Sequence, residues 1–244
     1  MSQPRVVTLD RKKHADLHYR ALEDYSFAMS MTTMPLLPHE APEAARCFPI
    51  IFPDSRNAVP HALLGLGGKN IFVDERGRWT APYLPLMAAN HPFSLSLVPG
   101  GEQPGAPEVA LAMEEDAPHF RQPDGEALYS PDGEPTETLK RIVAVMGNQY
   151  RLYRESERGL AELNLSGALL ERVASVREGG RERSVGGLRM ADRERVMALP
   201  DDTLGRWAKN GVLEMLFAHW RSMRNLQRLL DDPSCPKGAR NGVE

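Results

Sequence analysis

The sequence of residues 70–79 is NIFVDERGRW. In it a short apolar run is separated from Trp79 by charged residues and by a single glycine, Gly77. This pattern predicts a hairpin turn over residues 74–78, in which Gly77 is free to take a positive φ. We therefore expect the segments on either side of the turn to pair in antiparallel fashion.

Apolar runs of similar length, punctuated by proline and glycine, occur throughout residues 1–98 and predict further strands. The predicted strands span residues 5–9, 48–52, 59–66, 70–73 and 93–98. Residues 39–48 predict a short helix, in which Pro42 is tolerated only in the first turn.

The composition and the spacing of apolar residues change twice after residue 98. Residues 99–134 are rich in proline, glycine and acidic residues, and predict an irregular connection with one strand at 108–113. Apolar residues then recur at helical spacing over 136–162 and again over 212–230, with Gly159 as a candidate end of the first helix. Residues 160–176 are compatible with a second helix or with part of a β-hairpin.

These patterns predict an α+β fold, with an antiparallel β-rich N-terminal part and a mainly helical C-terminal part packed on it. The expected regions are a β-rich part at 1–98, the connection at 99–134, the helical part at 135–230 and a disordered tail at 231–244. Together they are compatible with one compact domain.

Composition excludes some classes of protein. The chain has 244 residues and a net charge of −3, and its apolar runs are far shorter than the about 20 residues that span a bilayer. The sequence thus excludes an integral membrane permease. The N-terminus has no apolar segment typical of a secretory signal, so we expect a soluble, cytoplasmic protein. Cys47 and Cys235 are expected to be free thiols.

Charge is distributed unevenly along the chain. Residues 1–134 carry 11 basic and 18 acidic side chains, whereas residues 135–230 carry 17 and 12. Arg221, Arg224 and Arg228 recur at helical spacing and are expected to face the acidic half of the chain. The arginine-rich run at 172–195 also contains acidic residues and lacks aromatic ones, so no nucleic-acid partner is expected.

The sequence contains no strong catalytic or metal-binding motif. It has no G-x-S-x-G nucleophile elbow and no complete phosphate-binding loop, and therefore no catalytic residue is assigned. No metal or other cofactor is expected. If the protein is an enzyme after all, the candidate metal ligands are the following: His14, Asp16, His18, His39 and Glu40.

Aromatic residues and prolines are concentrated between residues 72 and 93. Such a cluster can line a groove for a peptide or partner protein, because rigid rings contribute contact area at a small entropic cost. It can equally be the core of the sheet, and the sequence leaves both interpretations open. The candidate ligand-binding residues are Phe72, Trp79, Tyr83, Pro85 and Phe93.

Several longer segments, taken in order, resemble the bacterial SapC family across nearly the whole chain. They are LDRKKH (9–14), DYSFA (24–28), PLLPHE (35–40), AARCFPIIF (44–52), the segment 62–85 that contains NIFVDERGRW, LYSPDGEPTETL (128–139) and the segment 185–229. Where similar sequences have basic residues and an aromatic residue before Pro92-Phe93, this chain has Ala89-Asn90-His91. An anion site at that point is therefore not expected here.

The resemblance implies an accessory role and supplies no catalytic activity. The family takes its name from a surface-layer locus, some members are labelled as permeases, and relatives lie near genes for TonB-dependent receptors and halogenase-like flavoproteins. We expect a non-catalytic binding or accessory protein beside a bacterial envelope or uptake system, with a peptide or protein partner and an undetermined oligomeric state. The alternatives are a metal-dependent, oxygenase-like modifying enzyme working with a halogenase-like flavoprotein, and a structural protein of the surface layer.

Overall fold

The computed structural model describes residues 5–54, 56–97, 109–178 and 181–231, and for residues 97, 173–178, 181–188, 227, 230 and 231 it describes the backbone alone. The chain divides into two compact units. The first unit combines Met1–Glu23 with Ala89–Arg151, and the second combines Asp24–Ala88 with Leu152–Glu244. Each unit thus combines two segments that are separated in the sequence. Antiparallel sheets and helices occur together, which confirms the α+β class.

The first unit is built on a three-stranded antiparallel sheet with the order β1-β7-β6. Its strands are β1 (Val6–Thr8), β6 (Phe93–Leu97) and β7 (Val109–Glu114). A second, two-stranded sheet pairs β2 (His18–Tyr19) with β8 (Glu126–Ala127), and the 3-10 helix η3 covers Pro118–Phe120. The helix α3 (Glu137–Leu165) contributes its residues up to Arg151 to this unit. The buried core consists of Phe93, Met113, Leu128 and Leu139.

The second unit contains a sheet with the order β3-β5-β4 and a long hairpin. The sheet strands are β3 (Thr33–Pro35), β4 (Ile50–Ile51) and β5 (His61–Leu63); the hairpin strands are β9 (Leu169–Glu178) and β10 (Arg181–Ala191). The shorter N-terminal helices are η1 (Ser26–Ala28), η2 (Pro38–Glu40) and α1 (Ala41–Ala44), while α2 (Leu86–Ala89) lies at the boundary of the unit in sequence.

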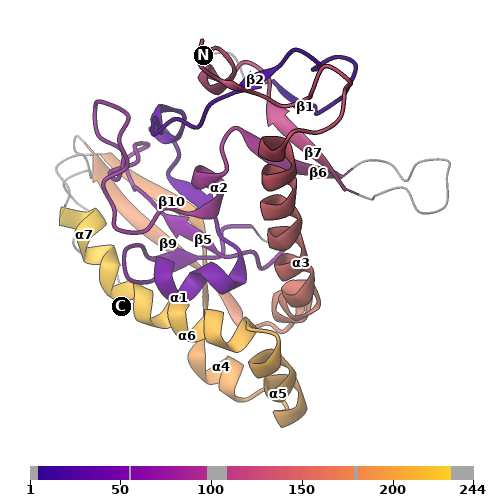
Figure 1. The fold of residues 1–244 in the computed structure, drawn as a ribbon. Coiled ribbons are helices and arrows are strands. Elements are labelled where there is room, and N and C mark those ends of the chain that lie inside the picture. The colour runs from indigo at the N-terminus through magenta and orange to yellow at the C-terminus, as the bar shows by residue number, and fades with distance from the viewer. Residues whose placement is uncertain (1–4, 55, 98–108, 179–180, 232–244) are drawn as a thin grey trace. The chain divides into compact units, whose positions relative to one another are not determined.

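The C-terminal helices of the second unit follow the hairpin in sequence (Figure 1). They are α4 (Arg193–Met197), α5 (Asp201–Lys209), α6 (Val212–Ser222), η4 (Met223–Asn225) and α7 (Leu226–Asp231). The predicted helix at 212–230 is therefore interrupted by the 3-10 turn η4. The largest buried side chains of this unit include Phe48, Phe52, Phe72, Trp207 and Met215.

The helix α6 is tied to both sheets of its unit by polar groups. The Nδ1 atom of His219 donates to the carbonyl of Ile50 at 2.6 Å, and its Nε2 atom accepts from the backbone N–H of Ala191 at 3.1 Å. Ser222 accepts from the backbone N–H of Ile50, and Trp220 donates to the carbonyl of Ala191. These bonds pair buried backbone groups at the ends of β4 and β10, where the strand ladders stop.

The turn predicted at residues 74–78 is present, and Gly77 has a φ of +76°. Its flanks form a single antiparallel bridge between Val73 and Trp79, so the strand expected at 70–73 was wrong. The reason is that Asn70 is buried and its side chain bonds the carbonyl of Ala28 and the N–H of Phe72, which takes the place of a strand ladder.

Gly159 does not end the long helix, which continues to Leu165. A Cβ atom at Gly159 would lie 2.6 Å from Nδ2 of Asn210 and 2.7 Å from Cγ2 of Val212. The glycine therefore permits a close approach of the α5–α6 connection. Of the two structures that residues 160–176 allowed, the hairpin is the one present from Leu169 onward. Of the tail expected to be disordered, residues 231–244, Asp231 ends the helix α7, and residues 232–244 lie outside the described residues.

Among the helices that the structure describes, none is both long enough and apolar enough to cross a membrane.

Candidate functional site

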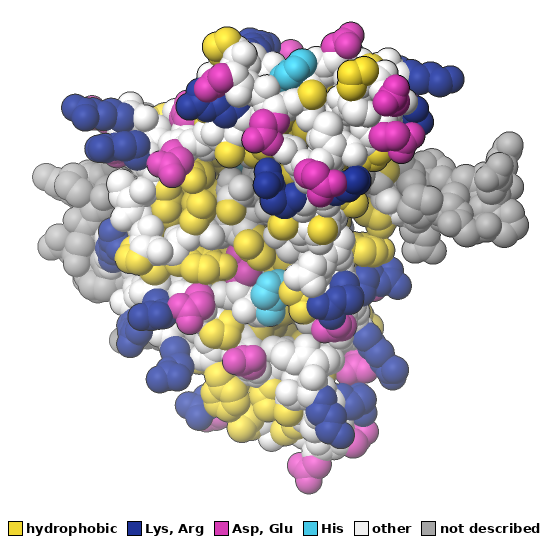
Figure 2. Space-filling view, viewed as in Figure 1, with side chains coloured by type: hydrophobic (Ala, Val, Ile, Leu, Met, Phe, Trp, Pro, Cys, Tyr) yellow, Lys and Arg dark blue, Asp and Glu magenta, His cyan; other side chains and the backbone are white. Residues whose placement is uncertain are grey.

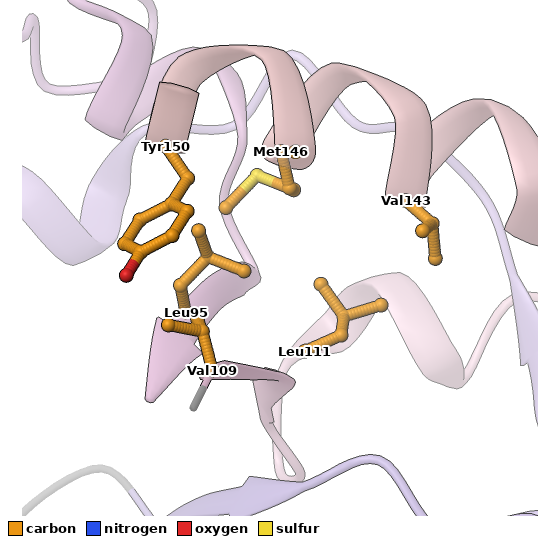
Figure 3. Close-up of a pocket in the computed structure, with 7 residues that line it drawn as sticks. Leu95, Val109, Leu111, Val143, Met146 and Tyr150 are labelled. Carbon is orange, nitrogen blue, oxygen red and sulfur yellow. The ribbon is translucent and has the colours of Figure 1, made fainter. Parts of the chain in front are cut away.

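An apolar hollow of about 380 Å³ lies in the first unit, between the β6–β7 hairpin and α3. Figure 3 shows Tyr150 and Met146 extending from α3 toward Leu95, and Val143 extending toward Leu111. The hollow is lined by Leu95, Val109, Leu111, Val143, Met146, Gly147 and Tyr150.

Local sequence patterns explain how these side chains converge. Leu95 and Leu111 are directly opposed in the antiparallel register of β6 and β7, so both point to one face of the sheet. Val143, Met146 and Tyr150 follow the helical spacing that places side chains on one face of α3. The strand and the helix therefore each present an apolar face to the hollow.

The hollow is open to solvent and is not filled by the side chains around it. Val143 is 50% exposed although it is an aliphatic residue at a lining position. A Cβ atom placed on Gly147 would have no heavy atom within 4 Å, so the helix has vacant space beside it at that residue. Open apolar surface of this kind is typical of sites that bind apolar groups.

The lining is almost entirely apolar. The lining side chains contain one oxygen atom, the hydroxyl of Tyr150, and no ionisable acid, base or nucleophile of the kinds that catalyse group transfer near neutral pH. An apolar ligand group would gain from leaving water here, while a charged group would lose its hydration without finding a partner.

The strand β6 lies at the edge of its sheet, and within the described ranges it pairs with β7 alone. The backbone N–H of Glu114 donates to the carbonyl of Pro92, which sets the register of the hydrogen-bonded pairs. Ser94 and Ser96 therefore direct their backbone groups toward β7, and Leu95 and Leu97 direct theirs to the outer edge. Edge groups of this kind accept an added strand.

A smaller hollow of about 240 Å³ lies on the other side of Met146, which borders both. Its lining includes Tyr19, Phe93 and Ile142, with Arg141 among the lining residues. Asn90 and Gln149 hold its border together, since Nδ2 of Asn90 donates to Oε1 of Gln149 at 2.6 Å. Phe93 is 6% exposed here and packs edge-on against Tyr19.

The aromatic cluster predicted from sequence is divided between the two units. Phe72, Trp79, Tyr83 and Pro85 belong to the second unit and Phe93 to the first. Phe72 is fully buried and lies edge-on to Phe48 with ring centroids 4.8 Å apart, and the ring of Trp79 lies close to both. Trp79 donates its indole N–H to the carbonyl of Tyr83 at 2.8 Å.

Glu40 connects this cluster to the neighbouring helix. Its carboxylate is buried and accepts three hydrogen bonds, from the N–H of Leu37, the N–H of Leu86 and the hydroxyl of Tyr83. Burial, followed by the charge of Glu40, raises the pKa of Tyr83 well above its usual value. Tyr83 is therefore a neutral donor throughout the physiological range.

The candidate metal ligands do not converge. His14 is buried with Nδ1 accepting from the N–H of Asp10, whereas His18 is exposed and bonds the carbonyl of Asp16. His39 is exposed while its neighbour Glu40 is buried. Throughout the described part of the chain, no group of three or more His, Cys, Asp or Glu side chains is arranged to hold a metal ion.

The hollow was not predicted from sequence, although its members were placed correctly on elements. Val143, Met146 and Tyr150 fell on the predicted apolar face of the helix, and Leu95 fell within a predicted strand. The available signal was an aliphatic helix face interrupted by Gly147, which lacks the side chain needed to fill a core.

These features define an α+β protein with an apolar hollow in its first unit. The chain belongs to the SapC family, because the sequence model of that family, described as SapC, matches residues 9–229. The resemblance found in the sequence is thereby confirmed. No curated protein and no solved structure gives a significant match to the chain.

Proposed function

We propose that this protein is a non-catalytic peptide-binding protein, and that the apolar hollow between β6, β7 and α3 is its binding site. The ligand is an extended segment of a peptide or partner protein with apolar side chains at alternate positions. The observation that carries this proposal is the hollow itself, with its aliphatic lining and the vacant space beside Gly147.

The volume of the hollow matches such a ligand. About 380 Å³ accommodates two or three aliphatic side chains, and burying each contributes roughly 1.5–3 kcal/mol. Association and ordering of the peptide offset much of this gain, so we expect a dissociation constant on the order of micromolar to hundreds of micromolar.

The edge of β6 supplies the polar part of the interaction. A peptide that adds to this edge pairs its backbone with the outward N–H and C=O groups of Leu95 and Leu97. Because side chains alternate across a strand, every second side chain of the added peptide points to the face on which Leu95 lies. Binding thus selects alternation of apolar residues.

Two glycines offer a matched pair of variants for testing the site. Gly147 and Gly205 both lie in helices, and a Cβ atom at either would have nothing within 4 Å, but only Gly147 lines the hollow. The probe is a fluorescein-labelled peptide of about eight residues in which valine and leucine alternate with threonine. We expect Gly147→Leu to fill the hollow and weaken binding at least about tenfold, while Gly205→Leu leaves the anisotropy titration unchanged.

A second peptide tests the edge of the sheet. An antiparallel added strand directs the N–H groups of its valines and leucines toward β6, because these residues lie opposite Leu95 and Leu97. In the second peptide the backbone nitrogens of the valines and leucines are methylated, and its affinity should fall because a methylated nitrogen cannot donate. Equal affinity of Gly147→Leu and the unaltered protein for the first peptide would reject the hollow as the site. Equal affinity for the two peptides would reject strand addition.

We place this binding in the cytoplasm of a bacterium, as an accessory function beside an envelope or uptake system. The family resemblance supports this setting. Cell fractionation tests it: recovery of the protein in the soluble cytoplasmic fraction is expected, whereas recovery in the surface layer would favour the structural alternative.

A further inference from the structure

A second groove, of about 310 Å³, lies in the second unit between α1 and α6. Its apolar surface comes from Pro42, Ala45, Phe217 and Ala218, and its charged groups are three arginines and one glutamate. The charged residues are Arg46, Arg221, Arg224 and Glu214. The lining therefore carries a net charge of +2, in contrast to the uncharged hollow of the first unit. Figure 2 shows basic side chains beside apolar surface on the face that carries α1 and α6.

The positive charge of this groove is only partly compensated by nearby carboxylates. Arg46 pairs with Glu43 at 3.0 Å, but Arg221 and Arg224 form no ion pair with any carboxylate that the structure describes. The two arginines are three residues apart on adjoining helical turns, a spacing at which like charges repel. An anionic ligand would relieve this repulsion and form charge-assisted hydrogen bonds with the guanidinium groups.

Phe217 gives the groove a fixed apolar contact. Its side chain is 39% exposed although the residue belongs to the helix that covers the core. The ring lies edge-on to Trp220 at a centroid distance of 5.4 Å, and Trp220 is itself held by its hydrogen bond to the carbonyl of Ala191 at 2.7 Å. A ring supported in this way contributes contact area without being ordered on binding.

We infer that this groove binds an acidic segment of a partner protein, in which an apolar side chain is flanked by Asp or Glu residues. The apolar side chain packs on Phe217 and the floor of the groove, and the carboxylates pair with Arg221 and Arg224. Charge complementarity and the mixture of aromatic and cationic groups within one groove favour this ligand. The site is separate from the hollow of the first unit and does not depend on the function proposed for it.

The probe is a fluorescein-labelled peptide of about ten residues with a central phenylalanine and two glutamates on each side, titrated against the full chain. The comparison ligands are the same peptide with glutamine for glutamate, a 12-nucleotide single-stranded DNA and inorganic phosphate as a competitor. We expect saturable binding of the acidic peptide, which weakens as salt rises, and at least about tenfold weaker binding of the glutamine peptide.

Substitutions separate a local site from the effect of overall charge. The double variant Arg221→Gln, Arg224→Gln should weaken the acidic peptide at least about tenfold. The matched control, Arg76→Gln with Arg172→Gln, removes the same charge from exposed positions of the same unit outside the groove and should change affinity less than about twofold. Phe217→Ala should weaken binding of the acidic peptide several-fold, and it leaves the charge unchanged.

Four results would overturn the inference. They are no saturable binding of the acidic peptide, equal losses in the two arginine double variants, binding of the DNA strand as tight as that of the peptide, and full displacement of the peptide by inorganic phosphate at low millimolar concentration. Circular dichroism of each variant establishes that the fold is retained, and all these arginines are exposed, so their replacement should not unfold the chain.

Discussion

The hydroxyl group of Tyr83 donates a hydrogen bond of 2.8 Å to Oε1 of Glu40, a residue 43 positions earlier in the chain. The same oxygen accepts the N–H of Leu86, and the other carboxylate oxygen accepts the N–H of Leu37. One buried side chain therefore fixes both the entry to the 3-10 helix η2 and the loop that leads into α2. This relationship makes Glu40 a structural residue of the second unit.

Replacing either partner should destabilise the second unit. Tyr83→Phe removes a hydrogen bond to a charged acceptor and should lower the free energy of unfolding by about 1–2 kcal/mol. Glu40→Gln should cost more, roughly 2–3 kcal/mol, because an amide presents donors where the carboxylate accepts. Urea unfolding followed by tryptophan fluorescence measures this unit specifically, since Trp79, Trp207 and Trp220 all lie in it.

The exposed residue Glu43 provides the control for this pair. Glu43→Gln alters a carboxylate whose side chain is 62% exposed and should change stability little. An effect as large as that of Glu40→Gln would contradict the role assigned to the buried carboxylate.

The same pair has a consequence at alkaline pH. The pKa of Tyr83 is higher in the folded protein than the usual value of 10, so the unfolded chain loses its phenolic proton first as pH rises. The contribution of Tyr83 is thus fully present below pH 10 and declines above it. We expect Tyr83→Phe to show a smaller loss of stability between pH 9 and 11 than the unaltered protein. A parallel decline in both would contradict the raised pKa.

Prediction from sequence succeeded where short-range patterns decide the structure. The glycine of the turn at 74–78 and the apolar face of α6 each depend on residues within a few positions of one another. The placement of Phe93 shows the limit. It lies 21 residues after Phe72 in sequence, yet the two rings belong to different units, because partners from residues 109–142 complete the surroundings of Phe93.

The hollow was missed for a related reason. An aliphatic residue on a helix face has the same sequence pattern whether its surroundings fill the space beside it or leave it vacant. Val143 and Met146 illustrate this, since both lie on the apolar face of α3 but one is half exposed and the other buried. Vacant space depends on the residues opposite, which the sequence of the helix does not contain.

The buried residue His219 should make the second unit less stable in mild acid. Burial lowers its pKa to about 4, because the charged form would lose hydration while Nε2 must stay unprotonated to accept the N–H of Ala191. In the unfolded chain the imidazole of His219 is protonated near its usual pKa of 6.5. The contribution of this residue to stability is therefore complete above pH 6.5 and is lost as the pH falls toward 4. The loss attributable to this residue is roughly 3 kcal/mol.

Urea titrations at several pH values between 7 and 4 test this prediction. His219→Gln should lower stability at pH 7 and flatten its dependence on pH. Burial also lowers the pKa of His61 in the same unit, so His61→Gln should flatten the dependence as well, by a smaller amount. The exposed His18 serves as the control. An unchanged pH dependence in His219→Gln would reject the assignment.

Substitution by alanine should affect stability differently at three glycines that lie within helices. A Cβ atom at Gly147 or Gly205 meets no heavy atom within 4 Å, so Gly147→Ala and Gly205→Ala should each stabilise the protein by about 0.5–1 kcal/mol through helix propensity. At Gly159 the new methyl group would lie 2.7 Å from Cγ2 of Val212 and still closer to Asn210, so Gly159→Ala should destabilise by roughly 1–3 kcal/mol. Thermal unfolding by circular dichroism follows all three. Stabilisation by Gly159→Ala would mean that the α5–α6 connection does not approach the helix as closely as described.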